Sequence, residues 1–166
     1  MNGMQKFYKS LVQGNYGEKI VAEYLCQRNN WTIIKRNNDI KYDFMLWTDE
    51  GKRTWEVKTD MYEVYRGITN NMVLETKCRG KLSGISATKA DYFIYYYPQW
   101  QIMYEIELKE LRHLMTTRGD LFWYKENIGD DGMASGFLAN RFKMMPYFKI
   151  YNLNHQTLKQ IKKKII

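Results

Sequence analysis

The first pattern of apolar and polar positions along the chain has the period of an α-helix. Val21 and Leu25 share one stripe with Glu18, and the pattern predicts a helix that begins near Asn15 and ends around residues 29–30. Asn15 stands three positions before Glu18, which fits a capping box whose glutamate satisfies the backbone of the first turn. Glu18 is therefore either a helix cap or an inward-facing carboxylate that needs a partner.

Strand patterns follow this helix. Residues 31–35 predict a short β-branched strand, residues 37–39 a loop, and residues 42–47 and 54–59 two strands joined by a turn at residues 48–51. Alternate residues of a strand point to opposite faces of its sheet. The two longer strands therefore predict a hairpin whose faces differ in chemistry.

That hairpin separates apolar from charged side chains. Phe44 and Trp55 lie on one parity, and Asp43, Glu56 and Lys58 lie on the other. A four-residue turn sets the pairing so that Glu56 lies opposite Asp43. Two carboxylates so placed repel unless a cation lies between them, and oxygen ligands select a hard divalent ion such as Mg²⁺. The hairpin therefore predicts a metal site, with Glu18 as a further ligand if the helix packs on it.

The second half of the chain contains further strand patterns and a helix. The tyrosine run at residues 95–97 alternates between the two faces of its strand, which indicates core rather than a base-stacking platform. We expect strands at 71–76, 90–97, 101–107 and 148–153, a turn or short helix at 86–89, a helix at 108–117 and a loop at 129–136. This order predicts a mixed α/β or α+β fold.

Composition narrows the class of protein. The 166 residues are 45% hydrophobic and carry 26 Lys+Arg against 18 Asp+Glu, a net charge of +8. This length and composition predict a single globular domain, 1–166, with a core motif at about 15–97 and a basic segment at 154–166. The charge favours a polyanionic partner such as nucleic acid.

Cysteines and hydropathy bear on the compartment. Cys26 and Cys78 lie far apart, which indicates neither a disulfide framework nor a zinc site and favours the reducing cytoplasm. No window approaches the roughly 20 consecutive apolar residues of a membrane span, so no membrane partner is expected.

Basic residues are concentrated in the last segment of the chain. Its lysines lie above apolar positions at helical spacing, and they fit either phosphate neutralisation or a solvated final helix. Lys89 and its neighbour Thr88 precede a predicted buried strand, and both are candidate phosphate contacts. The candidate nucleic-acid-binding lysines are Lys89, Lys159, Lys162, Lys163 and Lys164.

The charged hairpin resembles the core of the PD-(D/E)XK nuclease superfamily. Asp43 followed by Glu56-Val57-Lys58 carries the likeness, although Tyr42 stands where the motif has proline. The N-terminal half is similar to small restriction-endonuclease-like and Holliday-junction-resolvase-like members. Phage-encoded relatives are similar in the later part of the chain. These further likenesses lie at Gly17-Glu18, Ala22, Tyr24-Leu25, Ile34 and Asn37, and then at residues 83–85, 88–92 and 129–132.

The resemblance implies a fold and an activity. The fold would be a central mixed β-sheet flanked by helices, and the protein a Mg²⁺-dependent deoxyribonuclease that accepts Mn²⁺ as a substitute. Asp43 and Glu56 would hold the metal, Lys58 would serve the catalytic step, and Glu18 would assist at the metal. The substrate would be DNA, with branched or recombination intermediates as one class. A resolvase would work as a homodimer, and a phage-encoded member would act in the host cytoplasm.

Two other interpretations of the sequence stay open. Asp43, Glu56 and Lys58 would then be a solvated cross-strand ion pair worth only about 0.2–1 kcal/mol. The protein would be a non-catalytic nucleic-acid-binding module with a degraded nuclease fold, bound through its basic surface. Alternatively, its aromatic surface would bind another protein.

Overall fold

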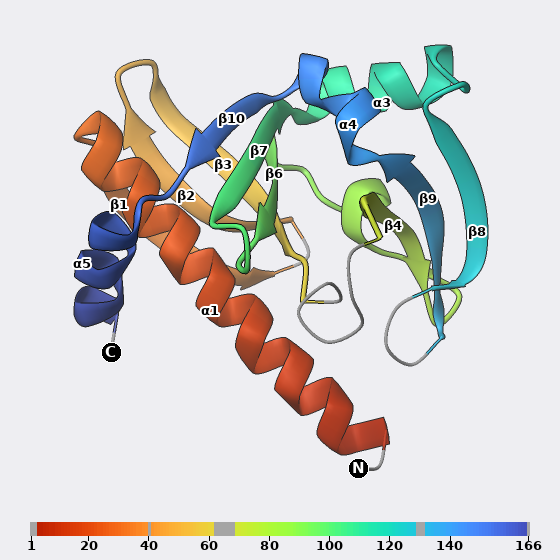
Figure 1. Cartoon of the computed structure of the whole chain (residues 1–166), viewed down its shortest axis with the longest axis horizontal. Coiled ribbons are helices and arrows are strands. Elements are labelled where there is room, and N and C mark those ends of the chain that lie inside the picture. The colour runs from red at the N-terminus through yellow and green to blue at the C-terminus, as the bar shows by residue number, and fades with distance from the viewer. Residues whose placement is uncertain (1–2, 40, 62–68, 129–131, 166) are drawn as a thin grey trace.

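The computed structural model describes residues 3–39, 41–61, 69–128 and 132–165. The strands in these residues form a six-stranded sheet of order β1-β2-β3-β6-β7-β10 and a four-stranded sheet of order β5-β4-β9-β8 (Figure 1). The first sheet contains β1 (Thr32–Asp39), β2 (Tyr42–Thr48), β3 (Gly51–Thr59), β6 (Tyr92–Tyr97), β7 (Ile102–Glu107) and β10 (Lys149–Asn152). The second contains β4 (Asn71–Cys78), β5 (Lys81–Leu82), β8 (Phe122–Ile128) and β9 (Ala134–Asn140).

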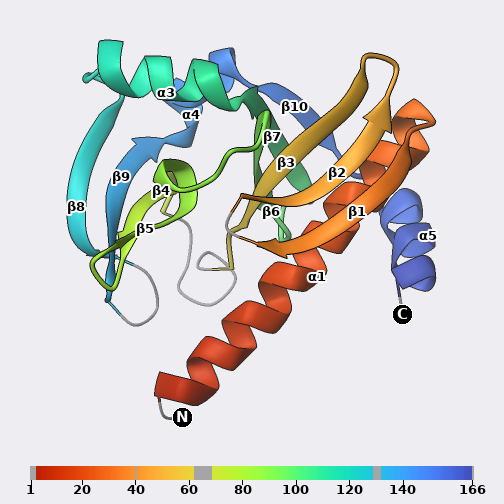
Figure 2. The same cartoon turned by 180° about the vertical axis from the view of Figure 1, so that it is seen from behind.

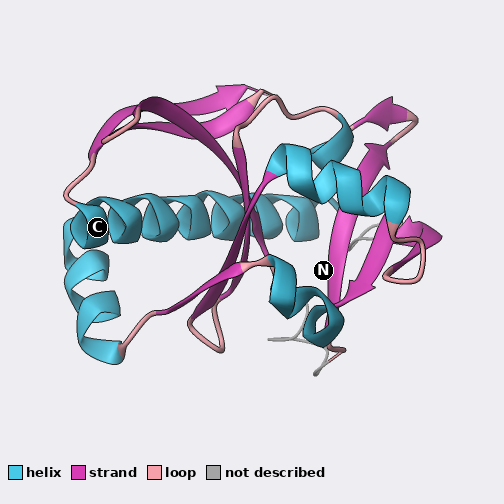
Figure 3. Cartoon of the chain, turned by 90° about the horizontal axis from the view of Figure 1, so that it is seen from above, coloured by secondary structure: helices cyan, strands magenta, loops and turns pink. Residues whose placement is uncertain are grey.

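Helices flank the sheets. α1 (Gly3–Asn29) runs along one face of the six-stranded sheet (Figures 1 and 3). α3 (Leu108–Thr117) lies across the end of the molecule that holds the four-stranded sheet (Figure 1). The central sheet is mixed, because β3 and β6 pair in parallel while the other neighbouring strands are antiparallel. The predicted mixed sheet flanked by helices is confirmed. The remaining elements are α4 (Arg141–Met144), α5 (His155–Ile165) and the 3₁₀ turns η1 (Gly84–Ser86) and η2 (Met145–Tyr147).

The central hairpin has the register expected from the sequence. Trp47 pairs with Lys52, and the ladder continues to the pair Phe44 and Trp55. The turn itself is shorter than expected, because Thr48 and Gly51 already pair and only residues 49–50 lie between the strands. The expected strands β4, β6, β7 and β10 and the helix α3 are also present.

The start of the first helix was wrongly placed near Asn15. α1 begins at Gly3, so Asn15 and Glu18 lie in its interior and the capping box does not exist. Leu11 and Val12 are exposed, at 48% and 67%, because the N-terminal half of α1 projects beyond the sheet (Figure 1). Apolar residues that stay exposed, as Leu11 and Val12 do, do not mark a buried helix face in the sequence.

One predicted loop is in fact strand, and another is strand in its last three residues. Residues 37–39 continue β1, whose register shifts accommodate them as irregularities. The predicted loop at 129–136 lies outside the described residues at 129–131, and β9 begins at Ala134. Gly136 is needed inside β9, since a Cβ there would lie 2.2 Å from the Leu74 carbonyl oxygen of β4. A glycine that looked like a loop marker therefore allows close strand packing.

Two hydrophobic cores lie on opposite faces of the six-stranded sheet. One packs β2, β3 and β6 against α1 and α5, and the other packs β6 and β7 against the four-stranded sheet and α3. As expected, the tyrosine run divides between them: Tyr96 belongs to the first core, and Tyr95 and Tyr97 to the second. The described helices include none that is long and apolar enough to cross a membrane.

Candidate metal centre

Asp43 lies at the start of β2, where the backbone pairing with β3 ends. One of its carboxylate oxygens, Oδ2, accepts a hydrogen bond of 2.7 Å from the backbone amide of Val57. The side chain thereby continues the contact between the strands and fixes the carboxylate beside Glu56. Burial raises the pKa of Asp43 to about 6, and the hydrogen bond from Val57 opposes that rise.

Glu56 lies in the middle of the sheet, on β3, where it pairs with Phe93 of the parallel strand β6. Burial is the main cause that raises its pKa to about 8, and the negative charge of Asp43 adds to the rise. A hydrogen bond with the Thr88 side chain and the positive charge of Lys58 oppose it. Glu56 therefore interacts with both other members of the predicted Asp-Glu-Lys set.

Glu18 reaches the same place from α1. The helix approaches β3 closely at Gly17, where a Cβ would lie 2.0 Å from the Thr59 hydroxyl oxygen. Burial and the charge of Asp43 raise the pKa of Glu18 to about 7, and Arg36 of β1 lowers it. The glycine thus lets the helix set its carboxylate against the end of the hairpin.

The structure brings Glu18, Asp43 and Glu56 together, and we call these residues the carboxylate cluster. Asp43 raises the pKa of both glutamates, and Glu18 also raises that of Glu56. Buried acids that repel one another retain a proton or take up a cation. An all-oxygen donor set of this kind suits Mg²⁺ or Mn²⁺.

The number of direct protein ligands is limited. No group of three or more His, Cys, Asp or Glu side chains in the described ranges is arranged to hold one metal ion. Two carboxylates nevertheless fit the chemistry of Mg²⁺, which keeps several of its waters and commonly binds one or two carboxylates. Asp43 and Glu56 fit this role, and Glu18 fits contact through a water.

The candidate phosphate-binding lysines do not form one group. Lys89 is exposed and lies near the cluster, since its backbone amide donates to the Lys41 carbonyl at 2.7 Å. The other lysines are exposed on α5, which lies on the far side of α1 from the end of β3 (Figures 1 and 2). One of these, Lys164, lies 3.7 Å from the carboxylate of Glu23. The remaining three are Lys159, Lys162 and Lys163.

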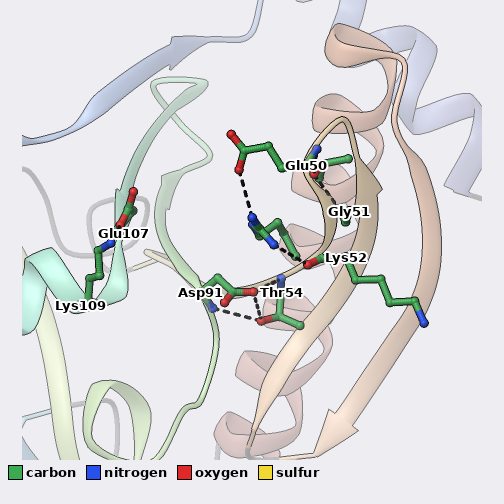
Figure 4. Close-up of polar contacts among 9 residues, drawn as sticks. Glu50, Gly51, Lys52, Thr54, Asp91, Glu107 and Lys109 are labelled. Atoms are coloured by element: carbon green, nitrogen blue, oxygen red, sulfur yellow. Dashed lines mark hydrogen bonds and ion pairs between the residues drawn. The ribbon is translucent and has the colours of Figure 1, made fainter.

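A second group of acids lies near the other end of β3. They line a cavity of about 690 Å³, which we call the aromatic cleft because Trp31, Trp55 and Tyr92 form part of its wall. Its acids have local partners, including Glu107 with Lys109 at 2.8 Å and Glu50 with Arg53 at 3.2 Å (Figure 4). The buried Glu105 accepts hydrogen bonds from the Trp55 indole and the Tyr151 hydroxyl, at 2.8 and 2.6 Å.

Some residues of the candidate centre were missed from the sequence. The sequence indicates Thr88 as a candidate phosphate contact, but the residue is 2% exposed and its hydroxyl faces Lys41 and Glu56. The approach of Gly17 to Thr59 joins elements 42 residues apart, and periodicity does not report such a contact. The Gly17-Glu18 pair was the one local signal, because a small residue beside an inward acid permits close helix packing.

Comparisons with known proteins give little support from sequence. No protein-family model matches the chain, and no curated protein matches it. A solved structure of a bacterial homing endonuclease, I-Ssp6803I, is similar to this chain, with 14% sequence identity and a TM-score of 0.44. The alignment covers 60% of this chain and 69% of the endonuclease chain.

Proposed function

We propose that the protein is a metal-dependent endonuclease that hydrolyses phosphodiester bonds of DNA, as the PD-(D/E)XK resemblance implies. The convergence of Glu18, Asp43 and Glu56 from three separate elements carries this proposal. A solvated ion pair would not place three partly or largely buried acids where they repel one another, because burial of an uncompensated charge is costly.

The residues divide the chemistry among them. Asp43 and Glu56 would hold Mg²⁺, and Glu18 would bind a water at the metal. When bound, the ion supplies a Lewis acid that polarises a phosphoryl oxygen and lowers the pKa of a bound water. Lys58 lies two residues beyond Glu56 on the same face of β3, where its ammonium would position the attacking water and offset phosphate charge.

The net charge of +8 supports a polyanionic substrate. The excess of basic residues over acidic ones would attract DNA to the protein although the carboxylate cluster itself is acidic. Branched DNA is the finer proposal, because two copies of the chain would present two such centres to two strands.

The test is a cleavage assay with duplex, flap, four-way junction and single-stranded DNA, with RNA alongside. We expect Mg²⁺-dependent cleavage of DNA that Lys58→Ala abolishes, while the variant keeps its melting temperature and its affinity for DNA. Full cleavage in a thoroughly chelated buffer, or unchanged cleavage by Lys58→Ala, would contradict the proposal.

A non-catalytic DNA-binding module is the second candidate, and the basic surface favours it. DNA binding that weakens steeply with salt, together with no cleavage of any substrate and no effect of Mg²⁺, would establish that function instead.

A further inference from the structure

Thr88 lies between η1 and β6 and is 2% exposed. Its hydroxyl donates to the Lys41 carbonyl at 2.9 Å, two residues before Asp43. The same side chain hydrogen-bonds the carboxylate of Glu56. A hydroxyl carries a single proton, so Thr88 donates either to the Lys41 carbonyl before Asp43 or to the carboxylate of Glu56, and its side chain lies between these two acceptors.

Neighbouring residues hold the same two strands. The Lys89 backbone amide donates to the Lys41 carbonyl at 2.7 Å. The Asp91 carboxylate accepts from the backbone amide and the hydroxyl of Thr54, both at 2.8 Å (Figure 4). Thr54 lies two residues before Glu56 on β3. The segment 88–91 therefore contacts Lys41, just before β2, and Thr54 of β3, just before Glu56.

The α3 helix anchors this segment from the other side. The Arg112 guanidinium donates to the Ile85 carbonyl at 2.7 and 3.3 Å and to the Thr88 carbonyl at 2.8 Å. Ile85 is itself buried, at 3% exposure. Because its backbone is bound on both sides, Thr88 cannot shift without breaking several hydrogen bonds.

We propose that Thr88 is a positioning residue whose hydroxyl lies between the Lys41 backbone and the Glu56 carboxylate and so holds Glu56 beside the start of β2, where Asp43 lies, for metal binding. This inference rests on the proposed metal centre. Residues that orient ligands in this way typically change metal affinity or activity by about 10–100-fold when they are replaced.

The experiment compares Thr88→Val, which keeps the shape and removes the hydroxyl, with Thr88→Ser, which keeps the hydroxyl. Mn²⁺ affinity is measured by calorimetry without DNA, and kcat and KM are measured on a cleaved DNA substrate. We expect Thr88→Val to bind Mn²⁺ about tenfold or more weakly and to lose kcat with KM unchanged. Thr88→Ser should restore both.

Thr76→Val is the matched control. The Thr76 hydroxyl also donates to a carbonyl, that of Ser135 at 3.1 Å, but in the four-stranded sheet. Its loss should lower the melting temperature without changing Mn²⁺ affinity. If Thr88→Val does not fold, Thr88→Ala and Thr88→Ser make the same comparison, and equal Mn²⁺ affinities of that pair would overturn the inference.

The outcomes separate the two proposals. A wild-type protein that binds Mn²⁺ and cleaves DNA, with Thr88→Val unchanged in both, overturns the role of Thr88 alone. A wild-type protein with no saturable Mn²⁺ binding overturns the metal centre and the role of Thr88 with it.

Discussion

Acids lie near both ends of β3, but those near one end have hydrogen-bond or ion-pair partners and those near the other end repel one another. In the aromatic cleft, Glu107 contacts Lys109 and Glu105 accepts two hydrogen bonds from aromatic side chains. In the carboxylate cluster, Asp43 raises the pKa of both Glu18 and Glu56. Acids with local partners are compensated within the fold, whereas buried acids that face one another either retain a proton or take up a cation. The contrast favours a structural role for the acids of the aromatic cleft and supports the metal site that we propose at the carboxylate cluster.

Cleavage should show the largest difference between the two ends. Asp43→Asn or Glu56→Gln should lower kcat by at least about 10²–10³-fold, because each removes a charge that the reaction requires. Glu107→Gln, the matched change in the aromatic cleft, should cleave like the wild type. An equal loss of kcat in all three variants would contradict the difference that we propose between the two ends of β3.

The pH dependence of stability should show the next largest difference between the two ends of β3. Each member of the carboxylate cluster has a pKa above its ordinary value, about 6 for Asp43, 7 for Glu18 and 8 for Glu56. At these three groups the folded protein therefore binds more protons than the unfolded chain between about pH 4 and pH 8, so their contribution to stability is largest at low pH and is lost as the pH rises through this window.

Thermal melts in EDTA test this pH dependence. We expect a loss of about 2 kcal/mol or more between pH 5 and pH 8, which corresponds to roughly 4–8 °C in melting temperature. Glu56→Gln should flatten the curve and Mg²⁺ should oppose the fall at pH 8, while Glu107→Gln should follow the wild type. A wild-type protein that becomes more stable over this range would contradict the burial of uncompensated acids.

The close contact between α1 and β3 at Gly17 should have a smaller effect on stability. Gly17→Ala should destabilise the protein by about 1–3 kcal/mol, because the new Cβ would overlap the Thr59 hydroxyl, and the shift of Glu18 should weaken metal binding. Gly14→Ala, three residues earlier, meets no described atom within 4 Å and should be neutral or stabilising by about 0.5–1 kcal/mol. Urea denaturation of both variants measures the difference, and equal stabilities would show that the contact is not tight.

The exposed ion pair of the aromatic cleft should matter least. Lys109→Ala removes the partner of Glu107, and both side chains are exposed to solvent, so the free energy of unfolding should stay close to that of the wild type. Cleavage should not change. A large loss of stability would mean that the pairs of the cleft are stronger than exposed contacts usually are.

Much of the six-stranded sheet could be predicted from the sequence, because alternation along β2 and β3 fixes both faces and the register. Phe44 and Trp55 are buried, and Asp43 and Glu56 converge as the hairpin pattern implies. The four-stranded sheet could not be predicted as fully. Its strand β8 exposes five consecutive positions between two buried ends and so carries no alternating pattern.

Long-range contacts limited the prediction of the candidate site. The acids are marked by their positions in strands and on a helix stripe. Thr88 donates a hydrogen bond to the Lys41 carbonyl, 47 residues away, and Arg112 of α3 donates one to the Thr88 carbonyl. Such contacts depend on how elements pack, and local spacing does not encode them.

Calorimetric titration with Mn²⁺ at pH 7.5 tests the central claim most directly. The wild type and Glu107→Gln should show the same saturable binding, and Glu56→Gln should show none while it remains folded. Indistinguishable titrations of the wild type and Glu56→Gln would contradict the assignment of a metal to the carboxylate cluster.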